Sequence, residues 1–205
     1  YENVRLTYPN CADELSKNCI AGEDYALVRY RDFDRQYYSP EIYEYLKERE
    51  FCYNPVKPLP LVKYTEVFSD LWKRFAKSEQ TARDFVIFDG SFLHHQINDL
   101  IRNYNASEED ITKHLTEMIR AVAVLNPIMF YLSPQDVGER LRKAWDDRGK
   151  TAPTKMDIDF WQTRKDMDLR VLERLSVESH VLGTTNNNWD SVPDSILMRI
   201  TKAKV

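Results

Sequence analysis

Residues 85–91 read Phe-Val-Ile-Phe-Asp-Gly-Ser, and this stretch decides the fold that the sequence predicts. Four consecutive apolar residues, all β-prone, favour a strand that is buried on both faces, as strands in parallel sheets are. Polar residues follow at once, where such a strand would end. We therefore expect a buried strand at 85–88 with functional side chains at its carboxyl end.

Two further apolar runs lie C-terminal to this stretch, at 127–132 and at 179–182. Helical patterns occur over 61–78 and 157–175, after 133–136, and after Ser39 and Ser107, each of which can cap the first turn of a helix. In the helix after Ser107, apolar residues line one side. Strands alternating with helices indicate a parallel sheet with right-handed crossovers. We therefore expect an α/β fold with a three-layer parallel sheet and helices on both faces. Three strands are few for 205 residues, so the N-terminal strands of that sheet are expected to be missing.

Composition narrows the classes of partner. The formal charge of −4 argues against broad nucleic-acid binding, which needs surplus cations, so no nucleic-acid partner is expected. No apolar run approaches the roughly 20 residues that cross a bilayer, so no membrane partner is expected. Three cysteines without metal-ligand spacing predict free thiols and a cytoplasmic location. A homodimer is compatible with the sequence.

The first candidate site is the polar segment after the strand at 85–88. The carboxylate of Asp89 could hold Mg²⁺ through water, accept a proton from a substrate hydroxyl, or cap the following helix. Ser91 could be a cap or a substrate contact. His94 and His95 are adjacent and point apart on a helix, so they cannot form a two-histidine metal pair. Together with Gln96 they are candidate substrate contacts.

The second candidate site is the helix after residue 132, which carries Arg140, Arg142 and Arg148. Guanidinium groups suit phosphate oxygens, both for binding and for stabilising the charge that develops during transfer. The alternative is a solvated helix face with salt bridges to Glu139 and Asp146. A third place for a ligand is the polar loop 183–190, which could equally be an ordinary surface loop.

Two quoted segments and the arginine helix resemble a known family: Phe-Val-Ile-Phe-Asp-Gly-Ser-Phe-Leu-His-His-Gln at 85–96, and Leu-Asn-Pro-Ile-Met-Phe-Tyr-Leu-Ser-Pro-Gln-Asp-Val at 125–137. They are similar to bacterial P-loop NTPases of the thymidylate-kinase-like group. The resemblance implies one P-loop kinase-like domain over 1–205, with a helical insertion at roughly 10–80. It also implies a sheet ordered 2-3-1-4-5 whose first two strands precede Tyr1.

The resemblance also implies roles for individual residues. Asp89 would be the catalytic acidic residue near Mg²⁺ and the acceptor, while Arg140 and Arg148 would be catalytic arginines and Arg142 a substrate contact. Asn186 and Asn187 would lie beside the adenine of ATP. The implied cofactors are ATP and Mg²⁺, and the implied partner is a small-molecule acceptor.

One departure from the family is large. The phosphate-binding motif GxxxxGK[ST] is absent, because the five glycines never stand in that spacing. We expect no kinase activity from this polypeptide without that loop, since the loop supplies much of the positioning in phosphoryl transfer. The leading hypothesis is an ATP-dependent phosphotransferase, when intact, that acts on a small nucleotide-like or hydroxyl-bearing acceptor.

Two other hypotheses stay open. The first is a non-catalytic interaction or nucleotide-binding protein that has lost the loop. The second is a hydrolase or nuclease built from the acidic residues Asp89, Asp136, Asp157 and Asp159.

Overall fold

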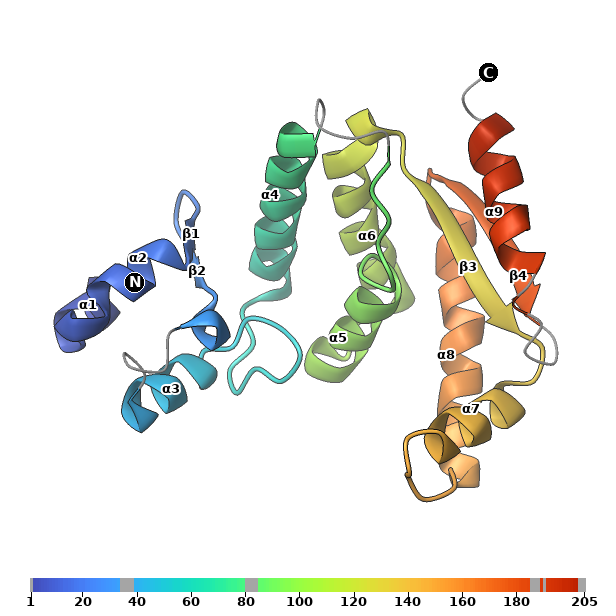
Figure 1. The fold of residues 1–205 in the computed structure, drawn as a ribbon, viewed down its shortest axis with the longest axis horizontal. Helices are drawn as coiled ribbons and strands as arrows, with labels where there is room; N and C mark the ends of the chain where they lie inside the picture. Colours follow the sequence, from blue (N-terminus) through green and yellow to red (C-terminus); the bar gives the residue numbers. More distant parts are fainter. Residues whose placement is uncertain (1, 34–38, 80–84, 185–188, 190, 203–205) are drawn as a thin grey trace. The chain divides into compact units, whose positions relative to one another are not determined.

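The computed structural model describes residues 2–33, 39–79, 85–184, 189 and 191–202. It is mainly helical, with 62% of residues in helices. The chain divides into two compact units, Tyr1–Val124 and Leu125–Val205, and each is described by itself (Figure 1). None of the helices in these described ranges is both long enough and apolar enough to span a bilayer. The expectation of a single domain over 1–205 stays a prediction.

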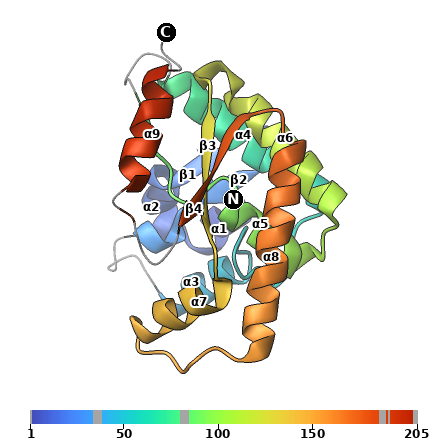
Figure 2. The ribbon, with the colours of Figure 1, turned by 90° about the vertical axis from the view of Figure 1, so that its right-hand side faces the viewer.

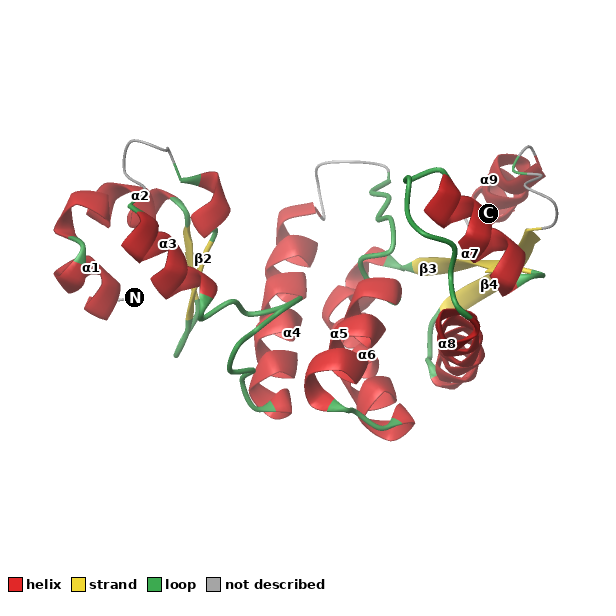
Figure 3. Cartoon of the chain, turned by 90° about the horizontal axis from the view of Figure 1, so that it is seen from below, coloured by secondary structure: helices red, strands yellow, loops and turns green. Residues whose placement is uncertain are grey.

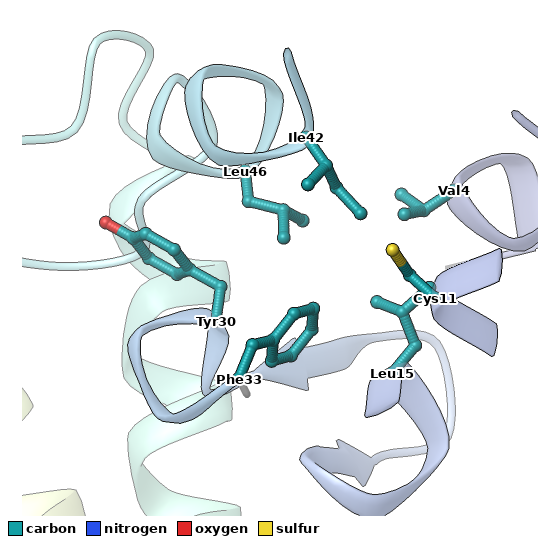
Figure 4. Close-up of a cluster of buried hydrophobic side chains, with 7 residues drawn as sticks. All are labelled: Val4, Cys11, Leu15, Tyr30, Phe33, Ile42 and Leu46. Atoms are coloured by element: carbon teal, nitrogen blue, oxygen red, sulfur yellow. The ribbon is translucent and has the colours of Figure 1, made fainter. Parts of the chain in front are cut away.

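The first unit begins with short elements around an apolar cluster. They are α1 (Glu2–Thr7), η1 (Pro9–Cys11), α2 (Ala12–Lys17), β1 (Cys19–Ala21), β2 (Ala26–Val28), η2 (Tyr30–Asp32) and α3 (Pro40–Lys47). The strands β1 and β2 pair antiparallel. Figure 4 shows how side chains from the helical elements converge on one core, which consists of Val4, Cys11, Leu15, Tyr30, Phe33, Ile42 and Leu46. The short helix expected after Ser39 is confirmed as α3, because the Ser39 hydroxyl caps it by accepting from Ile42 N at 3.3 Å.

The rest of the first unit is built from α4 (Leu61–Glu79), α5 (His94–Tyr104) and α6 (Glu108–Val122), and η4 (Ala123–Leu125) follows at the boundary between the units. Figures 1 and 3 show the three α-helices lying side by side. The turn between α5 and α6 follows from two local signals. Asn105 ends α5 in the left-handed region at φ 47°, and Ser107 and Asp110 form a capping box at the start of α6. The apolar stripe expected on α6 is buried.

The prediction of a strand at 85–88 is wrong. Within the described part of the chain this segment joins no strand ladder, and its side chains are exposed, with Ile87 at 89%. The Phe88 ring instead rests on Trp72 and Phe75 of α4, at centroid distances of 5.0 and 5.2 Å. The pattern identified residues that suit a strand, but a strand also needs a neighbour to pair with, which local sequence does not reveal.

The second unit contains β3 (Ile128–Pro134), α7 (Val137–Asp146), α8 (Lys155–Arg174), β4 (Glu178–Thr184) and α9 (Ser191–Lys202). The strands pair in parallel, from Ile128 opposite Glu178 to Pro134 opposite Thr184. Figures 2 and 3 both show this pair lying between α8 and α9. The parallel pairing predicted for the runs at 127–132 and 179–182 is thereby confirmed.

A buried ion pair within α8 is linked to β3 by a hydrogen bond from Tyr131. Arg164 Nε donates to Asp168 Oδ1 at 2.7 Å, and both side chains are almost fully buried. The hydroxyl of Tyr131 donates to the second oxygen of Asp168 at 3.2 Å. Burial, with the nearby Asp168 charge, raises the pKa of Tyr131, so this phenol stays protonated and keeps donating. The contact fixes the face of β3 that α8 covers.

The prediction of an α/β fold with a three-layer parallel sheet is therefore wrong. In the described residues the sheet structure consists of two separate two-stranded sheets, β1–β2 and β3–β4, rather than a three-layer parallel sheet with helices on both faces. The predicted P-loop kinase-like sheet needed a third parallel strand at 85–88, and among the described residues that segment belongs to neither sheet. Of the expected sheet, only the pairing of the last two strands is found.

Candidate functional site

In the first unit, Asp89 lies exposed in the bend before α5. The neighbouring Gly90 has φ 64°, a conformation that other residues rarely adopt. The hydroxyl of Ser91 donates to the Asp89 carbonyl oxygen at 3.2 Å, so it supports the bend locally. Asp89 keeps an accessible carboxylate, and its role as a catalytic or Mg²⁺-associated residue stays a prediction.

His94 and His95 begin α5 and are both exposed. Their rings lie 5.6 Å apart at 76°, and the His95 ring also meets the exposed Tyr53 ring edge-on at 6.0 Å. Over the described ranges, no group of three or more His, Cys, Asp or Glu residues could hold a metal ion. Mg²⁺ is commonly held by one or two carboxylates plus ligand phosphates, so Asp89 fits Mg²⁺ only together with a bound phosphate ligand.

Gln96 is placed differently from its neighbours. It is 5% exposed, and its amide oxygen accepts from the Tyr64 hydroxyl at 3.3 Å and lies 3.1 Å from His114 Nε2. The other ring nitrogen of His114 lies 2.8 Å from the Thr65 hydroxyl. Burial lowers the pKa of His114 to about 4, so the imidazole is neutral at pH 7. In this structure Gln96 faces the interior rather than the surface beside Asp89.

A carboxylate that the sequence argument missed lies at the centre of this interior network. Asp99 is 4% exposed and accepts from the Tyr64 hydroxyl at 2.8 Å, from Tyr53 N at 2.9 Å and from Asn103 Nδ2 at 3.2 Å. The bond to Tyr53 N holds a backbone at φ 68°, which is strained for a bulky residue. The network joins residues 51–54 to α4 and α5, so we interpret it as structural.

The sequence did contain a signal for this network. Gln96 and Asp99 share the buried face of α5 with the apolar Ile97 and Leu100. Polar residues on the apolar face of an amphipathic helix need partners inside the protein. The Tyr104 hydroxyl, also buried, has no hydrogen-bond partner within the described residues.

In the second unit, the carboxyl ends of β3 and β4 meet at one edge. Pro134 lies opposite Thr184, and Gln135 N donates to the Thr184 carbonyl oxygen at 3.3 Å. The chain then turns directly into α7, whose first turn is capped by Asp136 accepting from Glu139 N at 2.8 Å. Ligands of parallel sheets gather at such an edge, outside the carboxyl ends of the strands.

Three of the four acidic residues of the hydrolase hypothesis have structural partners. Asp136 caps α7, Asp157 forms a capping box with Thr154 at the start of α8, and Asp159 pairs with Lys155. Their carboxylates are therefore engaged in helix caps and a surface ion pair. The hydrolase hypothesis stays a prediction.

Arg140 is the predicted arginine that contacts the segment beyond β4. Its guanidinium carbon lies 5.4 Å from the centroid of the Trp189 ring, a cation–π contact. Arg142 turns back toward the first turn of α7, where its Nη1 lies 3.6 Å from the position that a Cβ on Gly138 would take. Arg148 follows the C-terminal end of α7, about two turns of helix from Arg140. The structure thus brings Arg140 and Trp189 together and leaves Arg148 apart.

The three arginines are exposed, and none of them forms an ion pair with a carboxylate in the part of the chain that the structure describes. The described residues therefore do not show the alternative arrangement, in which these arginines form salt bridges with Glu139 and Asp146. Asn186 and Asn187 lie outside the described residues.

Lys165 of α8 was missed by the sequence argument, and its amino group also lies at the strand ends, 2.6 Å from the Pro134 carbonyl oxygen. No sequence signal pointed to it, because α8 carries many charged residues at similar spacing.

The two groups of predicted site residues belong to different units, so each group is described by itself. Asp89, Ser91 and the histidines belong to the first unit, and the arginines belong to the second. Comparisons of the chain with protein-family models, with curated proteins and with solved structures gave no match.

Proposed function

We propose that the second unit binds the phosphate groups of a small ligand, with ATP as the expected ligand, at the carboxyl ends of β3 and β4. The observation that carries the proposal is Arg140, whose exposed guanidinium lies over Trp189 without a carboxylate partner among the described residues. An arginine held in place by an aromatic ring loses less freedom when it binds a phosphate.

Three features support this site. Parallel strands end there, and ligands favour such edges. The guanidinium fork of Arg140 matches the geometry of phosphate oxygens. The exposed indole of Trp189 gives the edge an apolar surface beside the cation.

The wider hypothesis of an ATP-dependent phosphotransferase stays a proposal. It requires Mg²⁺, an acceptor and a group such as Asp89 to receive the acceptor proton. Asp89 belongs to the first unit, and the phosphate site proposed here makes no use of it. We keep the cytoplasmic location as part of the proposal, because ATP is abundant there and no disulfide joins the described cysteines.

The binding test is a calorimetric titration of the whole chain with ATP, with and without Mg²⁺. The informative variant is Arg140→Met, which keeps an unbranched apolar stem and removes the guanidinium that lies over Trp189. A matched control is Arg120→Met on α6, which removes an exposed arginine paired with Glu117. Losing one charge-assisted contact should weaken binding about tenfold or more, whereas the control should bind like the wild type.

A second measurement separates binding from catalysis. The chain is incubated with γ-labelled ATP and a panel of nucleosides and sugars, and transfer of the label is followed. Binding without transfer or hydrolysis favours the non-catalytic nucleotide-binding alternative. Transfer of the label supports the phosphotransferase hypothesis. An Arg140→Met variant that binds ATP as tightly as the wild type contradicts the site.

A further inference from the structure

Lys165 has an unusual environment for a lysine. It lies on α8, is partly buried, and donates one of its three protons to the Pro134 carbonyl oxygen at 2.6 Å. Lysine is a strongly hydrated cation, so moving its amino group out of water is unfavourable unless other groups compensate the charge. A single carbonyl oxygen compensates only part of it.

The carboxylates close to Lys165 in sequence have other partners. Asp168 pairs with Arg164 and Tyr131, and Asp166 accepts from Gln162 at 3.0 Å. Lys165 itself makes no ion pair with a carboxylate inside the described ranges. The amino group therefore brings a positive charge, with two unused protons, to the edge where β3 ends.

Lys165 and Arg140 reach this edge from different helices. The Lys165 amino group contacts the last residue of β3. Arg140 lies one helical turn after Asp136, whose carbonyl accepts from Arg140 N at 3.1 Å, and its guanidinium lies over Trp189, which follows β4 in the chain. Two cations that approach one strand end from two elements suit an anion with more than one charged group. A single phosphate could satisfy either of them alone.

We propose that Lys165 is a second cationic contact for the phosphate ligand, and that the ligand therefore carries two or more linked phosphate groups. This inference rests on the proposed function. On ligand binding, the amino group exchanges the Pro134 carbonyl oxygen for a phosphate oxygen, or donates to both with different protons. Lysine suits this role because its ammonium is a compact charge on a flexible stem.

The test uses two variants of the whole chain and three ligands. Lys165→Gln keeps a donor for the Pro134 carbonyl oxygen and removes the charge, and Lys165→Arg keeps the charge. The dissociation constants of ATP, ADP and AMP are measured at one salt concentration. The wild type should prefer ATP and ADP to AMP by about tenfold or more. In Lys165→Gln this preference should fall to about threefold or less, and Lys165→Arg should largely restore it.

Each outcome bears on the proposal. If Lys165→Gln binds ATP as tightly as the wild type does, or if its affinities for AMP and ATP fall by the same factor, the role of Lys165 in a polyphosphate site is overturned. Ligand binding by the second unit then still stands. If the wild type binds none of the three ligands, the proposed function fails and the inference fails with it. Thermal unfolding is followed in parallel, because a purely structural lysine would lower stability in Lys165→Gln and leave the preference among ligands unchanged.

Discussion

The Asp99 network offers the sharpest test of how the first unit is held together. Replacing Asp99 by Ala removes the acceptor of three hydrogen bonds, from Tyr53 N, the Tyr64 hydroxyl and Asn103 Nδ2. Tyr64 is fully buried, so its hydroxyl would keep only the longer contact to Gln96, at 3.3 Å. Asn103 is less affected, because it lies closer to water.

The expected loss follows from the donors that lose Asp99 as their acceptor. A buried donor without an acceptor costs about 1–3 kcal/mol, and hydrogen bonds to a charged group lie at the upper end. Asp99→Ala leaves the partly buried Tyr53 N without this acceptor and the buried Tyr64 hydroxyl with only its longer bond to Gln96, so it should lower the free energy of unfolding of the first unit by about 3 kcal/mol. Asp99→Asn keeps one acceptor oxygen but turns an amide donor toward the other donors, so about half that loss is expected.

The assay is urea-dependent hydrogen exchange of the α5 amides, which reports the stability of this unit separately from the second. The control is Glu117→Gln, which breaks an exposed ion pair with Arg120 and should change stability by less than about 0.5 kcal/mol. If the stability of Asp99→Ala, measured by α5 exchange, stays within about 0.5 kcal/mol of the wild type, the Asp99 network does not hold the first unit together.

Three further predictions concern single side chains. The pKa of His114 is about 4 in the folded protein and 6.5 in the unfolded chain, so the unfolded chain binds the proton first as the pH falls. The free energy of unfolding should therefore fall by up to about 3 kcal/mol from pH 6.5 to pH 4 and stay constant above pH 6.5; in His114→Gln, acid titration should lack this slope. Gly22→Ala would place a Cβ 2.0 Å from the Tyr25 ring and should cost about 1–3 kcal/mol by urea unfolding, whereas Gly183→Ala meets open space and should cost less. Ile87→Ser should change the free energy of unfolding by less than about 0.5 kcal/mol, because the Ile87 side chain is exposed; a loss of several kcal/mol would instead support the prediction of a buried strand at 85–88.

Local signals in the sequence predicted local structure well. The helices after Ser39 and Ser107 begin where their capping residues predicted, and the helix that was expected over 61–78 is α4. These features depend on hydrogen bonds and side-chain spacing within one segment, so the sequence of that segment suffices. The parallel strands at 127–132 and 179–182 were also predicted, because the long helix α8 between them allows a parallel crossover.

Features that depend on distant partners were not predictable. The segment at 85–88 has the composition of a strand, yet its side chains are exposed, and the Phe88 ring contacts the aromatic residues Trp72 and Phe75 on α4. The same limit applied to the candidate sites. Arg140 was identified by its chemistry, but its contact with Trp189 and the position of Lys165 at the end of β3 are matters of tertiary packing.

We propose that the edge formed by the ends of β3 and β4 binds phosphate groups, and the fluorescence of Trp189 measures this binding directly. Intrinsic fluorescence is followed while the whole chain is titrated with ATP, in the wild type, in Arg140→Met and in Trp189→Phe. We expect a saturable change in the wild type, a midpoint shifted about tenfold or more to higher ATP concentration in Arg140→Met, and loss of the signal in Trp189→Phe. A wild type with no saturable change in fluorescence or heat at millimolar ATP, or an Arg140→Met midpoint equal to that of the wild type, would contradict it.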